Sequence, residues 1–189
     1  TNRSTGKMGY AIAEAARDRG AKVTLITAPT YLPIPVGVNL VAVGSAIEMQ
    51  KAVRNACLES DLLVMAAAVS DYRPSDPSDN KIKKTGDDGL SIDLSQNPDI
   101  IAGISGERLV KVAFAAETND VIENADAKLL SKGVDMVVAN DVSAADSGFG
   151  TDTNAVTFVR PGREPETMPL MDKFDVGNAL LDRALPLLK

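Results

Sequence analysis

The sequence predicts an α/β fold of the Rossmann-like, doubly wound type, with a mostly parallel sheet and helices on both faces. Segments with apolar residues at helical spacing alternate along the chain with short segments that are almost wholly apolar. Such apolar segments are typical of strands covered on both faces, as strands of a parallel sheet are. A pattern typical of an antiparallel hairpin appears only near the C-terminal end.

The first part of the chain predicts helix, strand, strand and helix in turn. Residues 6–19 form the first predicted helix, which Gly20 ends, and a strand follows at residues 21–27. After a loop rich in proline and glycine, we expect a short strand at residues 40–43. The next helix begins at Ser45, where SAIE has the spacing of a capping box.

The middle of the chain contributes the central strands. Residues 61–69, 109–116 and 134–140 are mainly apolar and are expected to form buried strands. Helical segments are expected between them, at residues 98–105 and 121–131. This order of elements gives the mostly parallel sheet.

The C-terminal part predicts an antiparallel hairpin and a closing helix. NAVTFV and ETMPLM flank a turn at residues 161–163, and the helix is expected from about Lys173 to Leu188. No repeat or linker divides the chain, so we expect residues 1–189 to form a single domain. A doubly wound fold normally begins with a strand, so we also expect a first strand and its loop to precede residue 1.

Composition narrows the possible functions. The formal net charge is −6 and 4% of the residues are aromatic, which disfavours a general nucleic-acid binder. With no histidine and one cysteine, Cys57, zinc chemistry, Ser/His/Asp hydrolysis and an intrachain disulfide are disfavoured. The longest apolar run, residues 62–69, is far shorter than the roughly 20 residues of a membrane helix, and no signal peptide is apparent. We therefore expect a cytoplasmic protein that binds neither nucleic acid nor membrane.

The N-terminal motif TNRSTGKMGYA places small residues and a lysine at a helix start, where free N–H groups favour phosphate. It is not a Walker A loop, because Met8 follows the lysine, and its glycines do not have GxGxxG spacing. A plain helix start, with Gly9 allowing close packing, explains the motif equally well.

Two alternative functions remain open at this point. A nicotinamide-dependent short-chain reductase has a similar order of glycine turn, helix and strand. Such enzymes usually use a Tyr-x-x-x-Lys pair, and none of Tyr10, Tyr31 and Tyr72 has a lysine four residues later. A non-catalytic nucleotide-binding module is the other alternative.

Two polar motifs follow the strand predicted at residues 61–69. SDYRP places Asp71 at the C-terminal edge of the sheet, where α/β folds bind ligands. KIKK, residues 81–84, gathers lysines between two segments rich in turn residues, so we expect it on a loop. A solvated loop is the plainer explanation for this charge run.

Several motifs occur in a fixed order along the chain: TNRSTGKMG, AAAVSDYRP, KIKK, QNPDI, FAAET, AKLLSKGVDMVVANDVS and FGTDTNAV. Together they resemble the bacterial phosphopantothenate-cysteine ligase family over nearly the whole chain. The resemblance implies a CTP-dependent acid–amino-acid ligase that condenses 4'-phosphopantothenate with L-cysteine through an acyl-cytidylate, releasing CMP and pyrophosphate, in coenzyme A biosynthesis. It also implies Mg²⁺ or Mn²⁺, a homodimer, and a flavin-dependent phosphopantothenoylcysteine decarboxylase domain as fused or separate partner. No FMN is expected on these residues themselves.

The resemblance also assigns roles to individual residues. Asn2, acting on the acyl-cytidylate, and Lys81, contacting the nucleotide, are the expected catalytic residues. The residues expected to bind CTP are Met65, Ala66, Ala67, Asp71, Lys81, Pro98, Asp99, Ile100, Ile101, Phe114, Lys128 and Lys132. Asp141 and Asp152 are candidates for holding the divalent ion, and the sequence does not choose between them. The preference for CTP over ATP comes from the resemblance alone.

Plain structural explanations exist for several of these residues. Pro98 and Asp99 suit the first turn of a helix. Phe114 lies in an apolar strand, where aromatic side chains usually belong to the core. Lys128 and Lys132 are four residues apart and share a helical face, as exposed lysines often do.

Overall fold

The computed structural model describes residues 4–78, 80–84, 89–106, 108–117, 121–141 and 150–188. Its helices are α1 (Lys7–Asp18), α2 (Ala46–Ala56), α3 (Val121–Lys132) and α4 (Lys173–Ala184), with the 3₁₀ turns η1 (Cys57–Glu59) and η2 (Leu185–Leu187). Its strands are β1 (Thr24–Thr27), β2 (Asn39–Ala42), β3 (Leu62–Met65), β4 (Tyr72–Pro74), β5 (Leu94–Gln96), β6 (Val110–Glu117), β7 (Met136–Asp141), β8 (Thr153–Asn154), β9 (Val156–Val159), β10 (Glu166–Thr167) and β11 (Met171–Asp172). Within these ranges, no helix is both long enough and apolar enough to cross a membrane.

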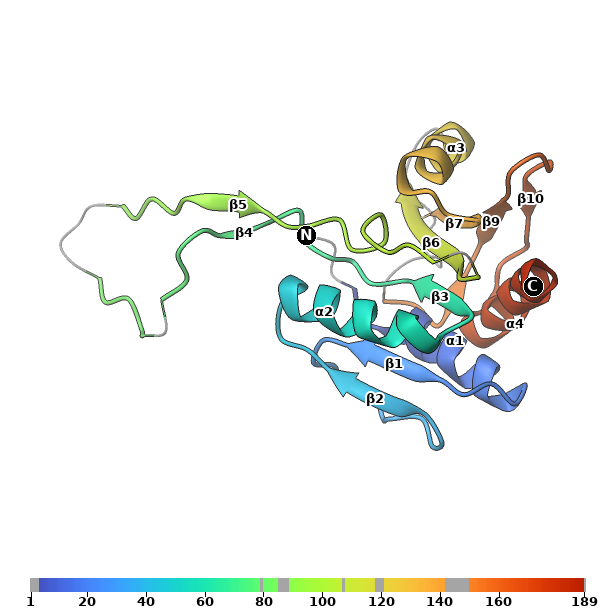
Figure 1. Cartoon of the computed structure of the whole chain (residues 1–189), viewed down its shortest axis with the longest axis horizontal. Coiled ribbons are helices and arrows are strands. Elements are labelled where there is room, and N and C mark those ends of the chain that lie inside the picture. The colour runs from blue at the N-terminus through green and yellow to red at the C-terminus, as the bar shows by residue number, and fades with distance from the viewer. Residues whose placement is uncertain are drawn as a thin grey trace.

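A five-stranded sheet forms the centre of the molecule, in the order β10-β9-β7-β6-β3 (Figure 1). Strands β3, β6 and β7 are parallel, whereas β9 pairs antiparallel with β7 and with β10. Strands β1 and β2 form a separate parallel pair. The predicted α/β fold with a mostly parallel sheet and a C-terminal antiparallel hairpin is therefore confirmed.

Helices cover both faces of the central sheet. Neighbouring residues of a strand point to opposite faces, so adjacent residues pack against different helices. Val112 of β6 and Val138 of β7 pack with α1 and α4. Ala113 and Val137, the adjacent residues, pack with α3 on the other face. A further cluster around Met49 of α2 contacts both β3 and the β1–β2 pair, and so joins that pair to the body.

Helices α1 and α4 approach each other closely at Gly177. A Cβ atom at this position would lie 3.2 Å from the Cβ of Ala15 and 3.2 Å from the Cα of Ile12. Glycine is the residue that allows two helix backbones to come so near. This contact fixes the position of α1 relative to α4.

Two predicted elements differ from the structure. The strand expected at residues 61–69 is limited to β3, whose side chains are only half-buried. The reason is that β3 lies at the edge of its sheet and, among the described strands, pairs with β6 alone. The helix expected at residues 98–105 is a single turn, in which the Gly103 amide donates to the carbonyl oxygen of Asp99 over 3.1 Å. Glycine has low helix propensity, which disfavours continuation of that turn.

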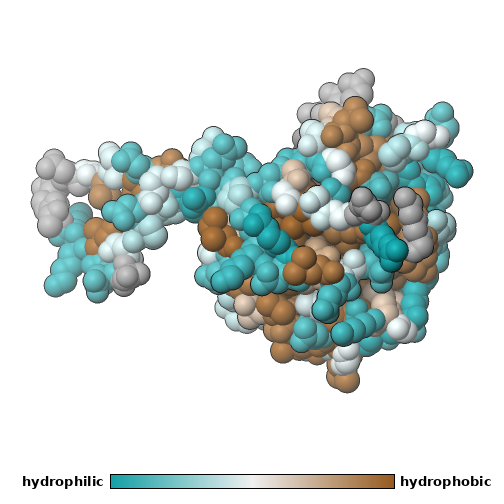
Figure 2. Space-filling model, viewed as in Figure 1, coloured by the Kyte–Doolittle hydropathy of each residue, from teal (hydrophilic) through white to brown (hydrophobic). Residues whose placement is uncertain are grey.

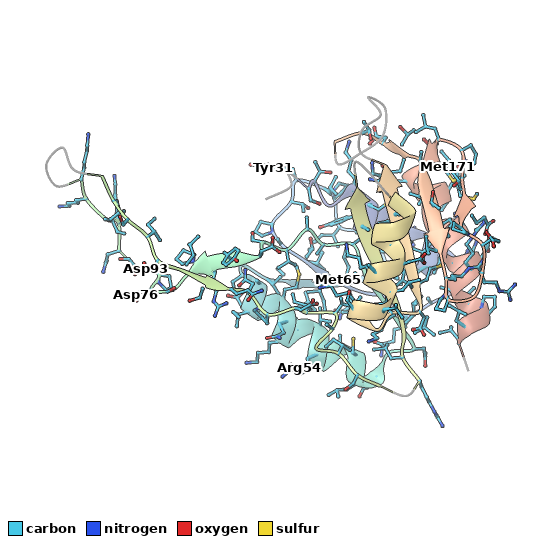
Figure 3. The ribbon with its side chains drawn as sticks, turned by 90° about the horizontal axis from the view of Figure 1, so that it is seen from above. Tyr31, Arg54, Met65, Asp76, Asp93 and Met171 are labelled. Atoms are coloured by element: carbon cyan, nitrogen blue, oxygen red, sulfur yellow. The ribbon has the colours of Figure 1, made fainter. Side chains whose placement is uncertain are left out.

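Residues 71–78, 80–84 and 89–97 belong to an arm that projects from the body (Figure 1). In its ribbon, β4 and β5 run antiparallel, with Tyr72 opposite Gln96 and Pro74 opposite Leu94. Hydrophilic residues cover much of the arm (Figure 2), and Asp76 and Asp93 lie close together on its two facing segments (Figure 3). Turns and a loop were expected here from the sequence, and the ribbon was not, because its two paired segments are far apart in the sequence.

Candidate ligand-binding site

A cavity of about 250 Å³ lies at the C-terminal ends of β3, β6 and β7. Residues 4–9, residues 66–69, Phe114, Ala115 and Asn140 form much of its wall, and the side chains of Lys128, Asn154 and Lys173 complete the lining. We call it the edge cavity. Its location matches the edge of the sheet at which open α/β folds bind ligands.

The start of α1 forms one side of the edge cavity. Gly6 caps this helix with a φ of 83°, a left-handed conformation that favours glycine. The first hydrogen bond of the helix runs from the Tyr10 amide to the Gly6 carbonyl over 3.1 Å. The N–H groups of the first turn have no partner within their own helix, and the helix dipole places partial positive charge there. This side of the cavity therefore favours an anion.

Lysines from three helices bring positive charge to the same cavity: Lys7 of α1, Lys128 of α3 and Lys173 of α4. The ammonium group of Lys128 lies 3.5 Å from the Phe114 carbonyl oxygen. Lys173 is only 5% exposed, and it donates to the carbonyl oxygen of Thr153 over 3.2 Å. Burial lowers the pKa of Lys173, and the nearby Lys7 charge lowers it further. The cavity is thus suited to a phosphate-bearing ligand.

The rim of the cavity carries an ion pair between Lys7 and Asp152. The Nζ atom of Lys7 lies 2.8 Å from Oδ1 of Asp152 and 3.0 Å from the carbonyl oxygen of Gly150. The hydrogen bond from Lys7 lowers the pKa of the Asp152 carboxyl. Asp152, a candidate metal ligand from the sequence, therefore pairs with a lysine in this structure.

The structure brings four of the sequence-predicted nucleotide-binding residues together in the edge cavity. These are Ala66 and Ala67 after β3, Phe114 of β6 and Lys128 of α3. The two alanines have small side chains, so a ligand can approach the backbone there closely. The other predicted residues lie outside the lining.

Asp99 and Lys132 form an ion pair away from the cavity lining. Burial by itself would raise the pKa of Asp99, but hydrogen bonds from Lys132 and from the Ala102 amide lower it overall. The preceding residue, Pro98, is half-buried. The pair fastens the turn after β5 to the end of α3.

Three further predicted residues are packed in the body. Ile100 and Ile101 are 3% and 7% exposed and belong to core clusters, so their side chains serve the core. Met65 packs against the same two clusters, and Figure 3 places it inside the body at the end of β3. None of these three residues lines the edge cavity.

Asp71 and Lys81 belong to the arm. Asp71 is exposed where the arm begins, and its carbonyl oxygen accepts from the Asn97 amide over 2.7 Å. Lys81 is exposed farther along the arm and does not line the edge cavity. Asn2 and the side chain of Asp141 lie outside the described residues, so their predicted roles stay predictions.

The part of the chain that the structure describes has no group of three or more His, Cys, Asp or Glu side chains that could hold a metal ion. Asp152 is the sequence-predicted metal candidate whose side chain is described, and it is exposed at the cavity rim. A divalent ion at this rim would need most of its ligands from elsewhere, such as the oxygens of a bound phosphate.

Several residues that line the cavity had no site role predicted from the sequence: Lys7, Asn140, Asn154 and Lys173. Lys7 did carry a signal, because it follows a glycine at a helix start, but no role was assigned to it. Lys173 carried none, because it reaches the cavity only through the packing of α4 against the sheet.

Known proteins resemble the chain in sequence. Residues 1–187 match the family model described as DNA/pantothenate metabolism flavoprotein C-terminal domain. The chain is 44% identical to the coenzyme A biosynthesis bifunctional protein CoaBC of Vibrio cholerae, over 96% of this chain and 46% of that protein. It is 43% identical to the protein of the same name from Bacillus subtilis, over 100% of this chain and 47% of that protein. The chain therefore spans somewhat under half the length of these relatives.

Solved structures resemble the chain in fold. The C-terminal domain of a coenzyme A biosynthesis bifunctional protein CoaBC superposes with a TM-score of 0.80 at 36% identity, covering 96% of this chain and 82% of that chain. A Cab2 mutant in complex with phosphopantothenate-cysteine has a TM-score of 0.74 at 16% identity, covering 98% and 78% of the two chains. The second likeness shows the shared fold alone.

Proposed function

The chain belongs to the DNA/pantothenate metabolism flavoprotein C-terminal domain family, in agreement with its motifs, and from this premise we propose that it is a CTP-dependent phosphopantothenate-cysteine ligase domain of coenzyme A biosynthesis. The carboxylate of 4'-phosphopantothenate attacks the α-phosphorus of CTP, and pyrophosphate leaves. The amine of L-cysteine then attacks the acyl-cytidylate, forming the amide and releasing CMP. Activation is needed because a free carboxylate is a poor acyl donor, whereas CMP is a good leaving group.

The observation that carries the proposal is the cationic edge cavity at the C-terminal ends of the parallel strands. CTP is a polyanion, and its partner substrate adds a carboxylate and a phosphate. A lysine about 4 Å from a phosphate oxygen contributes about 4 kcal/mol of attraction at an effective dielectric constant of 20. In the proposal, Lys128 supplies attraction of this kind, and the free N–H groups and dipole at the start of α1 add a smaller contribution within the same cavity.

The remaining wall suits the nucleoside. Ala66 and Ala67 leave the backbone after β3 open to a flat ligand, and Phe114 offers an aromatic side chain that is only half-buried. In the proposal these residues hold the base and ribose, while Lys128 binds the phosphates. Preorganised cations of this kind stabilise the charge that shifts toward pyrophosphate in the transition state.

The arm supplies Lys81 in this proposal. Lys81 lies on the projecting arm and does not line the edge cavity, so in the proposal the arm moves toward the cavity before Lys81 contacts the nucleotide.

Asn2 is proposed to hydrogen-bond the acyl carbonyl of the cytidylate. Mg²⁺ or Mn²⁺ is proposed to bind mainly through the phosphates, with Asp152 as the carboxylate at the rim, and it offsets phosphate charge when bound.

We propose a homodimer in which the arm contacts a second copy. Leu94 and Pro74 share one face of the ribbon with Tyr72, and Leu94 and Tyr72 are strongly exposed. Leu90 and Ile92, at alternate positions before Leu94, are exposed as well. An isolated two-stranded ribbon is only marginally stable in water, so a covering partner would stabilise this apolar face.

The rest of each longer relative is proposed to correspond to the flavin-dependent decarboxylase domain implied by the resemblance. A decarboxylase would consume the amide product, so fusion or association of the two domains is chemically sensible. This partner remains separate from the ligase chemistry of the edge cavity.

A direct test measures pyrophosphate release from the chain with CTP and 4'-phosphopantothenate, followed by CMP release on adding L-cysteine. We expect pyrophosphate only when both the nucleotide and the acid are present. Thermal unfolding with CTP, ATP and NADPH provides an independent measurement, because a ligand that binds the folded state raises the melting temperature. Stabilisation by NADPH and not by CTP would refute the ligase proposal and favour a reductase.

A further inference from the structure

The two side chains of the Lys7–Asp152 ion pair at the rim of the edge cavity differ in their exposure to solvent. The side chain of Lys7 is 31% exposed and lines the cavity, whereas that of Asp152 is 85% exposed. Exposed ion pairs of this kind contribute little to stability, because water screens them. The partner of Lys7 is therefore one that a more highly charged anion can readily replace.

A buried lysine holds Asp152 in its place. Lys173 donates through its ammonium group to the carbonyl oxygens of Thr151 and Thr153, the residues on either side of Asp152. The backbone amide of Lys173 also donates to the Asp152 carbonyl over 2.9 Å. These bonds fix the backbone around Asp152, so its carboxylate meets Lys7 at the rim.

We propose that Lys7 is an anion-binding residue of the edge cavity, which Asp152 holds at the rim until a phosphate group replaces the carboxylate as its partner. Lys7 is the first residue of α1, so its ammonium group and the free N–H groups of that turn act on the same region. A phosphate there also gains the attraction of Lys128 across the cavity. Asp152 opposes this exchange, and Lys173 acts as a positioning residue for Asp152.

The ligand class is a phosphate or polyphosphate group. Within the proposed function, on which this identification of the ligand rests, it has two sources: the triphosphate of CTP or the phosphate of 4'-phosphopantothenate. Inorganic tripolyphosphate is a probe that has the charge without the nucleoside or the acid. It therefore tests Lys7 independently of the ligase reaction.

The experiment is calorimetric titration of the full chain with tripolyphosphate in metal-free buffer. Lys7→Gln should weaken binding about tenfold, the usual loss for a hydrogen bond to a charged group. Asp152→Asn should tighten binding about two- to fivefold, because it removes a competitor of modest strength. In the double variant that gain should disappear, since no lysine is left to be released.

Matched variants separate binding from folding and from overall charge. Lys7→Arg keeps the cation and should bind tripolyphosphate nearly as the wild type does. Lys51→Gln, on the exposed surface of α2, makes the same charge change and should leave binding unaltered. Lys173→Met should abolish the response to Asp152→Asn, because Asp152 is no longer held against Lys7.

Three results would overturn the inference: unchanged tripolyphosphate binding by Lys7→Gln, weaker binding by Asp152→Asn, or a gain that persists in the double variant. Separate titrations with CTP and with 4'-phosphopantothenate show which phosphate depends on Lys7. If CTP does not bind while the tripolyphosphate responses hold, the proposed function fails and this inference stands. If ligation proceeds while Lys7→Gln alters no anion affinity, the reverse is true.

Discussion

Replacing glycine by alanine at two helical positions, Gly177 of α4 and Gly9 of α1, should have opposite effects on the free energy of unfolding. At Gly177, a new Cβ would lie 3.2 Å from the Ala15 Cβ, 3.2 Å from the Ile12 Cα and 3.3 Å from the Ala11 carbonyl oxygen. None of these atoms can move aside by a side-chain rotation, so α1 itself must shift. At Gly9, apart from the neighbouring backbone of its own helix, no atom of the described residues lies within 4 Å of the position that a Cβ would occupy.

The magnitudes follow from two opposing terms. Overpacking of a close contact costs about 1–3 kcal/mol, and the rigid neighbours of Gly177 place it in the upper half of that range. Alanine regains about 1 kcal/mol over glycine within a helix. Gly177→Ala should therefore lower the free energy of unfolding by about 1–2 kcal/mol, whereas Gly9→Ala should raise it by up to about 1 kcal/mol.

Urea unfolding followed by circular dichroism measures both changes, with an unchanged dependence on urea concentration as the check that the unfolding reaction is the same. In thermal unfolding, each kcal/mol corresponds to about 2–4 °C for a chain of this size. If Gly177→Ala matches or exceeds the wild type in stability, the close contact between α1 and α4 does not constrain the fold as described.

Three other predictions concern charge, assembly and binding. The pKa of Asp99 is lowered in the folded protein, so the stability it provides is present above its reference value of 3.8 and is lost as the pH falls through the folded value. Urea midpoints measured from pH 5 downward should fall less steeply in Asp99→Asn; an identical slope would contradict the ion pair. Leu94→Lys should weaken the proposed dimer about tenfold or more in sedimentation, while Ser95→Lys on the other face of the ribbon should weaken it less. Equal effects would exclude the apolar face as the contact. Lys128→Gln should raise the dissociation constant of CTP about tenfold in calorimetry, and unchanged affinity would remove Lys128 from the site.

Local interactions account for the parts of the fold that the sequence predicts well. Ser45 is the N-cap of α2, and its hydroxyl accepts from the Glu48 amide over 3.2 Å, as the SAIE spacing indicates. The Glu48 carboxylate reaches back to the Gly44 amide over 2.8 Å, one residue earlier than expected for a capping box. Helix α1 was also predicted from a local pattern, because Ile12 and Ala15 lie at helical spacing, and both are buried in the structure.

Interactions between distant segments account for what the sequence did not predict. The β4–β5 ribbon joins residues on both sides of the lysine run, and no local pattern marks their pairing. Lys173 reaches the edge cavity because α4 packs against the sheet and α1, and the carbonyl groups that its ammonium group contacts lie 22 and 20 residues earlier in the chain. Ala66, Ala67, Phe114 and Lys128 were identified through the family resemblance, and their meeting in one cavity required the assembled sheet.

The close contact at Gly177 has a mechanical consequence for the cavity. Both α1 and α4 begin at its wall, and they touch near the start of α4 and the middle of α1. Because so little space separates the two backbones at Gly177, we expect the starts of α1 and α4 to move together. If ligands of different size bind in the edge cavity, the surrounding loops should then adjust to them more than the spacing between these two helix starts.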